Sequence, residues 1–223
     1  LKRIGSESKM VAAIGNRLAL SALTLAFNEK NLVGAVTTEV EGLLAIRKHE
    51  PDLLICTEQL EQGYGINLIK QTEILNSSIK TLLLLERESE QVVDEALSAG
   101  CDGIVNTKTI GEGNAEFVDA LEKVLKGGIY YPASIRLMSQ EAGKKRGLAG
   151  TDLGLSKREK EVLQGVCLGK TNREIAAALF LSPETIKVCI QTMLVKLDAK
   201  DRTHAAVIAI QRGFSLDQES PYG

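Results

Sequence analysis

The feature that most constrains the fold is a series of helix-start signals near the end of the chain. Ser156 and Thr171 are each followed three residues later by a glutamate. This is the pattern of a capping box, in which hydroxyl and carboxylate satisfy free amides of the first helical turn. Ser182 and Asp201 are two further residues of the type that caps a helix. Residues 155–214 are therefore predicted to form four short helices.

The helix that follows Ser182 is amphipathic. Pro183 suits its first position, and apolar residues recur at helical spacing on one face, at Ile186, Ile190, Met193, Leu194 and Leu197. The opposite face carries Glu184, Lys187, Val188, Gln191 and Val195. Because residues 180–182 join it closely to the helix after Thr171, the pair is predicted to be a helix-turn-helix.

This pattern resembles the LuxR-type DNA-binding domain over nearly all of 155–214. The matching residues are Leu155-Ser156, Arg158-Glu159, Val162-Leu163, Gly169, Asn172, Glu174-Ile175-Ala176, Leu181-Ser182, Thr185-Ile186-Lys187, Lys196-Leu197 and Arg202-Thr203. The resemblance implies that the second helix of the motif enters the major groove of double-stranded DNA. It implies contacts with the DNA backbone from Thr171, Arg173, Thr185, Lys196 and Arg202.

Three exposed positions are the candidates for reading base edges. Lys187 can donate to guanine O6 and N7, Gln191 can pair with adenine, and Val188 can pack on a thymine methyl group. An ordinary solvated helix face is the alternative, and the surrounding motif favours groove contact.

The charge of the chain divides unevenly. Residues 1–150 carry 17 Lys and Arg against 20 Asp and Glu, whereas residues 151–214 carry 10 against 7. Such a modest basic excess predicts moderate DNA affinity from one domain, and hence a homodimer. The alanine-rich face of the last helix, 203–212, would let two copies approach closely.

Residues 10–126 show a different pattern, in which short apolar runs alternate with helical segments. The expected strands are 10–14, 32–35, 52–56, 81–85 and 102–105. Such alternation predicts a doubly wound α/β domain with a parallel five-stranded sheet. The fold class is therefore α/β followed by all-α.

This first part resembles the receiver domain of response regulators in Pro51-Asp52, Gly65, Ala96 to Gly100 and Asp102-Gly103. The resemblance implies the flavodoxin-like strand order 2-1-3-4-5. As in the NarL/FixJ group, a short helix should leave the receiver within residues 127–154. The glycines and the basic run Lys144-Lys145-Arg146 predict a flexible linker over 141–154.

The chemistry of a receiver is missing from the matching positions. Phosphorylation needs a nucleophilic aspartate, an acidic pair for magnesium, a hydroxyl and a lysine. The residues that stand there are Thr57 for the aspartate, Gly15 and Asn16 for the acidic pair, Leu85 for the hydroxyl and Thr107 for the lysine. The domain is therefore interpreted as a pseudo-receiver with a degenerate phosphorylation site.

Two one-residue slips would restore part of that chemistry. Glu58 could take the aspartate position, but strand alternation would then turn Leu53 and Ile55 to the other face. Lys108 could replace Thr107, yet a lone lysine holds neither metal nor phosphoryl group.

No catalytic, metal or cofactor site is predicted. The four cysteines, Cys56, Cys101, Cys167 and Cys189, form no CxxC pair, and His49 and His204 have no partner at ligand spacing. Reduced, mostly buried thiols are expected. No apolar run approaches the roughly 20 residues of a membrane span, so the protein is expected to be cytoplasmic, without a membrane partner.

The sequence thus predicts a dimeric, sequence-specific transcription regulator that does not depend on aspartyl phosphorylation. A protein partner or small ligand at the pseudo-receiver would supply the input. Two alternatives stay open: an interaction adaptor whose helical domain mainly dimerises, and a conventional phosphorylated regulator that uses Glu58. An enzyme is not expected, since no nucleophile, base and orienting group occur at usable spacing.

Overall fold

The computed structural model describes residues 8–27, 30–109, 115–214 and 222. The chain divides into two compact units, residues 1–127 and 128–223. Each unit is built around its own core.

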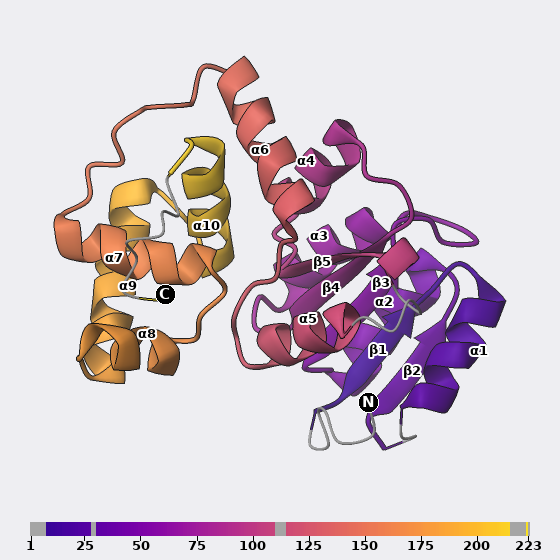
Figure 1. The fold of residues 1–223 in the computed structure, drawn as a ribbon. Helices are drawn as coiled ribbons and strands as arrows, with labels where there is room; N and C mark the ends of the chain where they lie inside the picture. Colours follow the sequence, from indigo (N-terminus) through magenta and orange to yellow (C-terminus); the bar gives the residue numbers. More distant parts are fainter. Residues whose placement is uncertain (1–7, 28–29, 110–114, 215–221, 223) are drawn as a thin grey trace. The chain divides into compact units, whose positions relative to one another are not determined.

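The first unit is a parallel five-stranded sheet covered by helices (Figure 1). Its strands are β1 (Met10–Ala13), β2 (Leu32–Val36), β3 (Leu53–Thr57), β4 (Lys80–Leu85) and β5 (Gly103–Asn106). They lie in the order β2-β1-β3-β4-β5, which confirms the predicted doubly wound topology. All residues of β1 and β3 are buried, as expected for strands packed on both faces.

The helices of this unit are α1 (Arg17–Ala26), α2 (Glu39–His49), α3 (Gly65–Leu75), α4 (Glu90–Ser98) and α5 (Glu116–Leu125). A short 3-10 helix, η1 (Thr107–Thr109), follows β5. Asn16, Thr38 and Ser89 cap α1, α2 and α4 through their side-chain oxygens. Because the strands are parallel, their carboxyl ends share one edge of the sheet, and the loops leading to α1 and α3 meet there.

The second unit contains five helices: α6 (Ala133–Lys145), α7 (Lys157–Cys167), α8 (Asn172–Leu179), α9 (Pro183–Leu197) and α10 (Arg202–Gln211). Both predicted capping boxes are present, at the starts of α7 and α8. Asp201 accepts a hydrogen bond from the amide of His204 at the start of α10. The four predicted helices of 155–214 are thus confirmed.

The linker predicted for 141–154 starts later than expected. Helix α6 continues to Lys145, and its Ala142 and Gly143 are buried. A Cβ on Gly143 would lie 2.8 Å from the Cα of Gln211 and closer still to its carbonyl oxygen, so α6 and α10 touch backbone to backbone. The small residues that suggested a loop in fact permit this close packing.

Two further contacts tie the predicted linker to the second unit. The amide of Gly150 donates to the carbonyl of Arg212 at 3.1 Å, and Leu153 and Leu155 are buried. The alanine-rich face of α10 is also buried within this unit, since Ala205, Ala206 and Ala209 are covered. That face is therefore not available to a second copy, contrary to the expectation.

Within the described residues, no single helix has the length and apolar composition to cross a membrane; only the bent pair α8 and α9 would meet that test jointly.

Candidate functional site

The turn between α8 and α9 sets the geometry of the helix-turn-helix. Phe180 adopts the left-handed conformation, with φ 54° and ψ 45°, and ends α8. Ser182 then caps α9 by accepting from the amide of Thr185 at 3.1 Å. The two helices meet at 107°, within the range that helix-turn-helix motifs use.

Helix α9 buries one face and exposes the other as the periodicity predicts. Its buried residues are Ile186, Ile190, Met193 and Leu197. Lys187, Val188 and Gln191 are all exposed, and they lie together on the outer face because they are one, three and four positions apart. This face can offer an ammonium group, a branched apolar group and an amide to a ligand.

The candidate phosphate contacts fall into two groups. Arg173, at the start of α8, and Thr185, at the start of α9, are exposed. Thr171 is half-buried because its hydroxyl caps α8. These residues lie at the amino-terminal ends of α8 and α9, where the helix dipoles favour an anion.

Lys196 and Arg202 are held by contacts within the domain. The Nζ atom of Lys196 lies 2.8 Å from Oε2 of Glu159, a buried carboxylate at the start of α7. Arg202 donates to the carbonyl of Lys170 at 2.6 Å and to Oδ1 of Asn172 at 3.3 Å. Arg202 therefore ties α10 to the start of α8, a role that the sequence pattern did not indicate.

The carboxylate of Glu159 joins the start of α7 to Lys196 of α9. Its pKa is lowered, first by the hydrogen bond from Lys196 and then by the bond from the backbone amide of Ser156. The carboxylate thus serves the capping box and the ion pair to α9 at once, and it fixes α9 on α7.

Phe180 was not singled out from the sequence. Phe180 is 95% exposed in the turn before α9, and a non-glycine residue with positive φ is uncommon. Val188 and Val195 are also exposed. No local sequence signal distinguishes this aromatic residue from a core position.

In the first unit, Thr57 is bonded to the loops around it. Its hydroxyl accepts from the amide of Gly15 at 3.0 Å and donates to the carbonyl of Gln59 at 2.7 Å. A Cβ on Gly15 would lie 2.9 Å from the Cα of Leu60 and closer to the carbonyl oxygen of Gln59. The loop after β3 therefore packs on Gly15, at the position where an acidic side chain would stand.

The five residues of the degenerate site are not all brought together. Asn16, Thr57 and Thr107 line one cavity of about 340 Å³, along with Leu84 and Glu86. Leu85 is fully buried and is not part of its lining. The cavity lies at the carboxyl ends of the strands, as the topology predicts.

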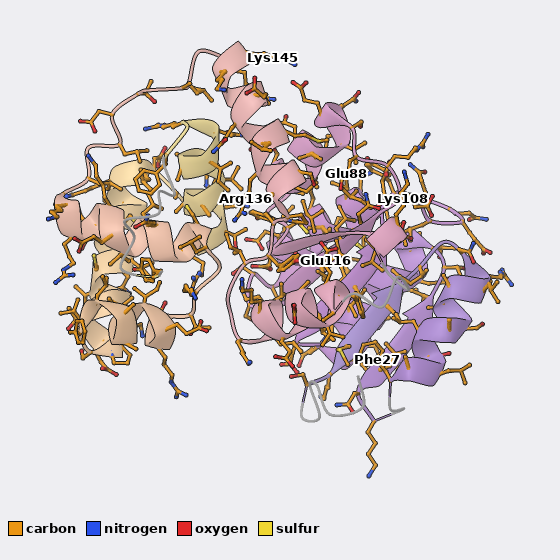
Figure 2. All side chains as sticks on the ribbon, in the orientation of Figure 1. Phe27, Glu88, Lys108, Glu116, Arg136 and Lys145 are labelled. Atoms are coloured by element: carbon orange, nitrogen blue, oxygen red, sulfur yellow. The ribbon has the colours of Figure 1, made fainter. Side chains whose placement is uncertain are left out.

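Shifting the alignment by one residue, to Glu58 or to Lys108, does not bring a reactive group into this cavity. The register pairs Thr57 with Leu84, and Glu58 is buried, does not line the cavity and has a carboxylate oxygen without a hydrogen bond. Lys108 is exposed on η1 (Figure 2) and likewise does not line the cavity.

The thiols have raised pKa values. Burial raises the pKa of Cys56 well above its ordinary value, the pKa of Cys101 and Cys167 to about 12, and the pKa of Cys189 by a smaller amount. A protonated thiol is a poor nucleophile and metal ligand. In the described ranges, no three His, Cys, Asp or Glu side chains are grouped to hold a metal ion.

Comparison with known proteins gives consistent results for both units. Residues 153–209 match the family of bacterial regulatory proteins, luxR family. The chain is 30% identical over 176 residues to the uncharacterized transcriptional regulatory protein YxjL of Bacillus subtilis, covering 77% of this chain and 79% of YxjL. It is 27% identical over 195 residues to the response regulator protein VraR of Staphylococcus aureus, covering 87% and 91%.

Among solved structures, one of RcsB, described as two dimers bound to two parallel DNAs, matches with a TM-score of 0.53. The match covers 93% of this chain and 99% of that one, at 21% identity. At this identity the likeness establishes the fold alone.

Proposed function

The chain belongs to the bacterial response regulators that carry a luxR-family DNA-binding domain, and from this membership we propose that it regulates transcription by placing α9 in the major groove of double-stranded DNA. The observation that carries the proposal is the exposed row of Lys187, Val188 and Gln191 on a helix whose opposite face is buried in the domain core. Each of these side chains matches a distinct group on a base edge. The chain acts as a binding protein rather than as an enzyme.

Phosphate contacts would hold this helix in register. Arg173 and Thr185 are exposed in the first turns of α8 and α9, and these turns present amides to an anion. Lys196 is half of an ion pair but remains partly exposed, so it can add charge near the backbone. Arg202 contributes indirectly, because its bonds to Lys170 and Asn172 position the start of α8.

The protein is proposed to bind DNA as a homodimer. The net positive charge of 155–214 is small, and a single module with few phosphate contacts has modest affinity at physiological salt. RcsB, which has the same fold, is described as dimers bound to DNA, and this supports a dimer on DNA for the present chain. The surface that joins two copies is not the alanine face of α10, since α6 and α7 pack around that helix.

The first unit is proposed to act as a pseudo-receiver, independent of aspartyl phosphorylation. Thr57 offers a neutral hydroxyl that is already bonded on both sides. Gly15 stands in a loop contact where no acidic side chain fits. With no carboxylate nucleophile and no magnesium-binding pair, aspartyl phosphate cannot form.

Selection of bound sequences from a random DNA pool tests the proposed function. A two-fold dimer of this motif should select an imperfect palindrome with half-site centres about 10 to 10.5 base pairs apart. Binding should weaken steeply as salt rises. Recovery of single asymmetric half-sites at saturating protein would contradict the dimer, and the absence of salt-dependent binding would favour the adaptor.

A further inference from the structure

The cavity at the carboxyl ends of the strands is a half-open cleft between α1 and α5. It is lined by α1 residues on one side and by Phe117 of α5 on the other, with the ends of β1, β3 and β4 as its floor. Its volume of about 340 Å³ is at the lower end of the range for small-molecule sites.

Small side chains form most of the α1 side of the cleft. Ala19, Ala22 and Ala26 line it, whereas the large residues Leu18 and Leu25 point outward and are more than four-fifths exposed. Protein interiors are normally close-packed. Ala19 and Ala22 are exposed although Leu20 of the same helix is buried, so the alanine side of α1 leaves apolar wall uncovered.

The wall is mainly apolar, and its polar side chains are those of Asn16, Thr57, Glu86 and Thr107. Ile14, Leu23, Leu84 and Phe117 contribute most of its bulk. Thr57 is already bonded on both sides, but in the described part of the chain no hydrogen bond or ion pair holds the Thr107 hydroxyl or the Glu86 carboxylate. Among the described residues that line the cleft, none is a lysine or arginine.

We propose that this cleft binds a small, mainly apolar molecule that carries one ammonium group. The apolar part would cover the alanine side of α1 and the ring of Phe117, which removes apolar surface from water. The ammonium group would pair with Glu86 at the rim, and Thr107 would accept a hydrogen bond from it. An anion such as a phosphoryl group is disfavoured, because the lining supplies a carboxylate and no cation.

The site is tested by titrating the ¹⁵N-labelled full chain with 2-phenylethylamine, 2-phenylethanol and phenylacetate, and following amide shifts by NMR. The three compounds are similar in size and differ in charge. We expect the amine to cause saturable shifts at 14–26, 84–86 and 107. The alcohol should bind about fivefold more weakly, since bonds to charged groups are stronger, and phenylacetate should bind more weakly still.

Two substitutions on α1 probe the location of the site. Ala22→Phe should abolish binding by filling the cleft, and Ala19→Leu should weaken it if Ala22→Phe does not fold. Leu18→Phe is the matched control, since Leu18 lies on the outward face of the same helix, and it should bind the amine as the parent does. Glu86→Gln should remove the preference for the amine over the alcohol and leave the alcohol affinity unchanged.

Four results would overturn the proposal. They are unchanged amine binding in Ala22→Phe and Ala19→Leu, shifts centred outside the cleft, equal binding of phenylacetate and amine, and no saturation by about 10 mM of any probe. Loss of self-association in Ala22→Phe, without saturable binding of the amine to the parent, would instead assign the cleft to a second copy of the chain. The outcome does not depend on DNA binding, which is measured separately.

Discussion

The backbone amide of Gly15 donates a hydrogen bond to the hydroxyl of Thr57 at 3.0 Å, and so joins the loop after β1 to the end of β3. In a working receiver the groups at these two positions repel one another unless a magnesium ion lies between them, because both carry carboxylates. Here they attract one another. Thr57 thus stands at the position of the nucleophile, and Gly15, which bonds to it, stands at the position of an acidic residue. Placing a carboxylate at one of the two positions therefore does not restore the phosphorylation site.

Incubation with acetyl phosphate and magnesium is expected to leave the intact mass of the protein and its DNA affinity unchanged. Thr57→Asp should remain unphosphorylated as well, since Gly15 and Asn16 supply no charge to hold the metal. Mass spectrometry and a DNA mobility shift measure the two quantities. A gain of one phosphoryl group located to Glu58, with tighter DNA binding, would restore the conventional switch.

Thr57→Val should destabilise the first unit by about 1 to 2 kcal/mol, because the amide of Gly15 and the carbonyl of Gln59 lose their common partner while the side-chain shape is kept. Urea unfolding followed by fluorescence of the tyrosines or by circular dichroism gives the difference. Thr24→Val is the control: Thr24 is exposed on α1 and bonds only to the carbonyl of Ser21. Equal effects of the two substitutions would mean that the Thr57 bonds contribute nothing.

The pair of Glu159 and Lys196 should make the second unit sensitive to acid. Lys196 and the amide of Ser156 hold the pKa of Glu159 below its ordinary value. A carboxylate with a lowered folded-state pKa contributes stability that is complete above the unfolded value, about 4.3. That contribution is lost as the pH falls toward the folded value.

Glu159→Gln should therefore lower stability at neutral pH and flatten the decline below about pH 4.3. Thermal unfolding measured from neutral to acidic pH shows both effects. Glu161→Gln is the matched control, two residues further along α7, where Glu161 is partly exposed and pairs with Arg158. If the stability of the two variants declines in parallel as the pH falls, Glu159 is not the group whose titration causes the decline.

The sequence predicted the elements better than it predicted how they pack. The buried strands and the two faces of α9 follow from residue spacing, because burial imposes a period on each element. The packing of α6 did not follow. Gly143 and the basic run 144–146 have the composition of a solvated loop, and only the approach of Gln211, far along the chain, makes a small residue necessary there.

The candidate sites show the same division. The exposed row on α9 was visible in the sequence, whereas the bonds of Arg202 were not, because one partner is the backbone carbonyl of Lys170, which has no side-chain signature. The cleft between α1 and α5 was foreseen as a degenerate phosphorylation site that could take a ligand, but its walls were not. They depend on where Ala19, Ala22 and Ala26 of α1 lie relative to Phe117 of α5, and residue spacing alone does not fix that.

Gly143→Ala should destabilise the second unit by about 1 to 3 kcal/mol, since an added methyl group meets the backbone of Gln211 and forces α6 away from α10. Chemical unfolding of the full chain measures the effect. Lys144→Ala, at an exposed position on the same helix, should change stability by less than about 0.5 kcal/mol. A neutral Gly143→Ala would show that α6 does not pack on α10 in solution.

The last prediction separates base reading from phosphate binding within the helix-turn-helix. Lys187→Ala should cost about 1 to 3 kcal/mol on the selected operator and relax the preference at one base position, because Lys187 lies on the exposed row of α9 that we propose faces the groove. Arg173→Ala should weaken binding to all sequences alike and reduce the slope of log affinity against log salt by about 1, since Arg173 lies outside that row at the start of α8. Lys70→Ala removes the same charge from an exposed position on α3 in the other unit, and it should leave affinity, specificity and salt slope unchanged. Affinities measured on the operator and on single-base variants at several salt concentrations distinguish the three. If Lys187→Ala retained the parent's preference at every position while losing affinity uniformly, Lys187 would be a phosphate contact, and the reading of bases by α9 would rest on Val188 and Gln191 alone.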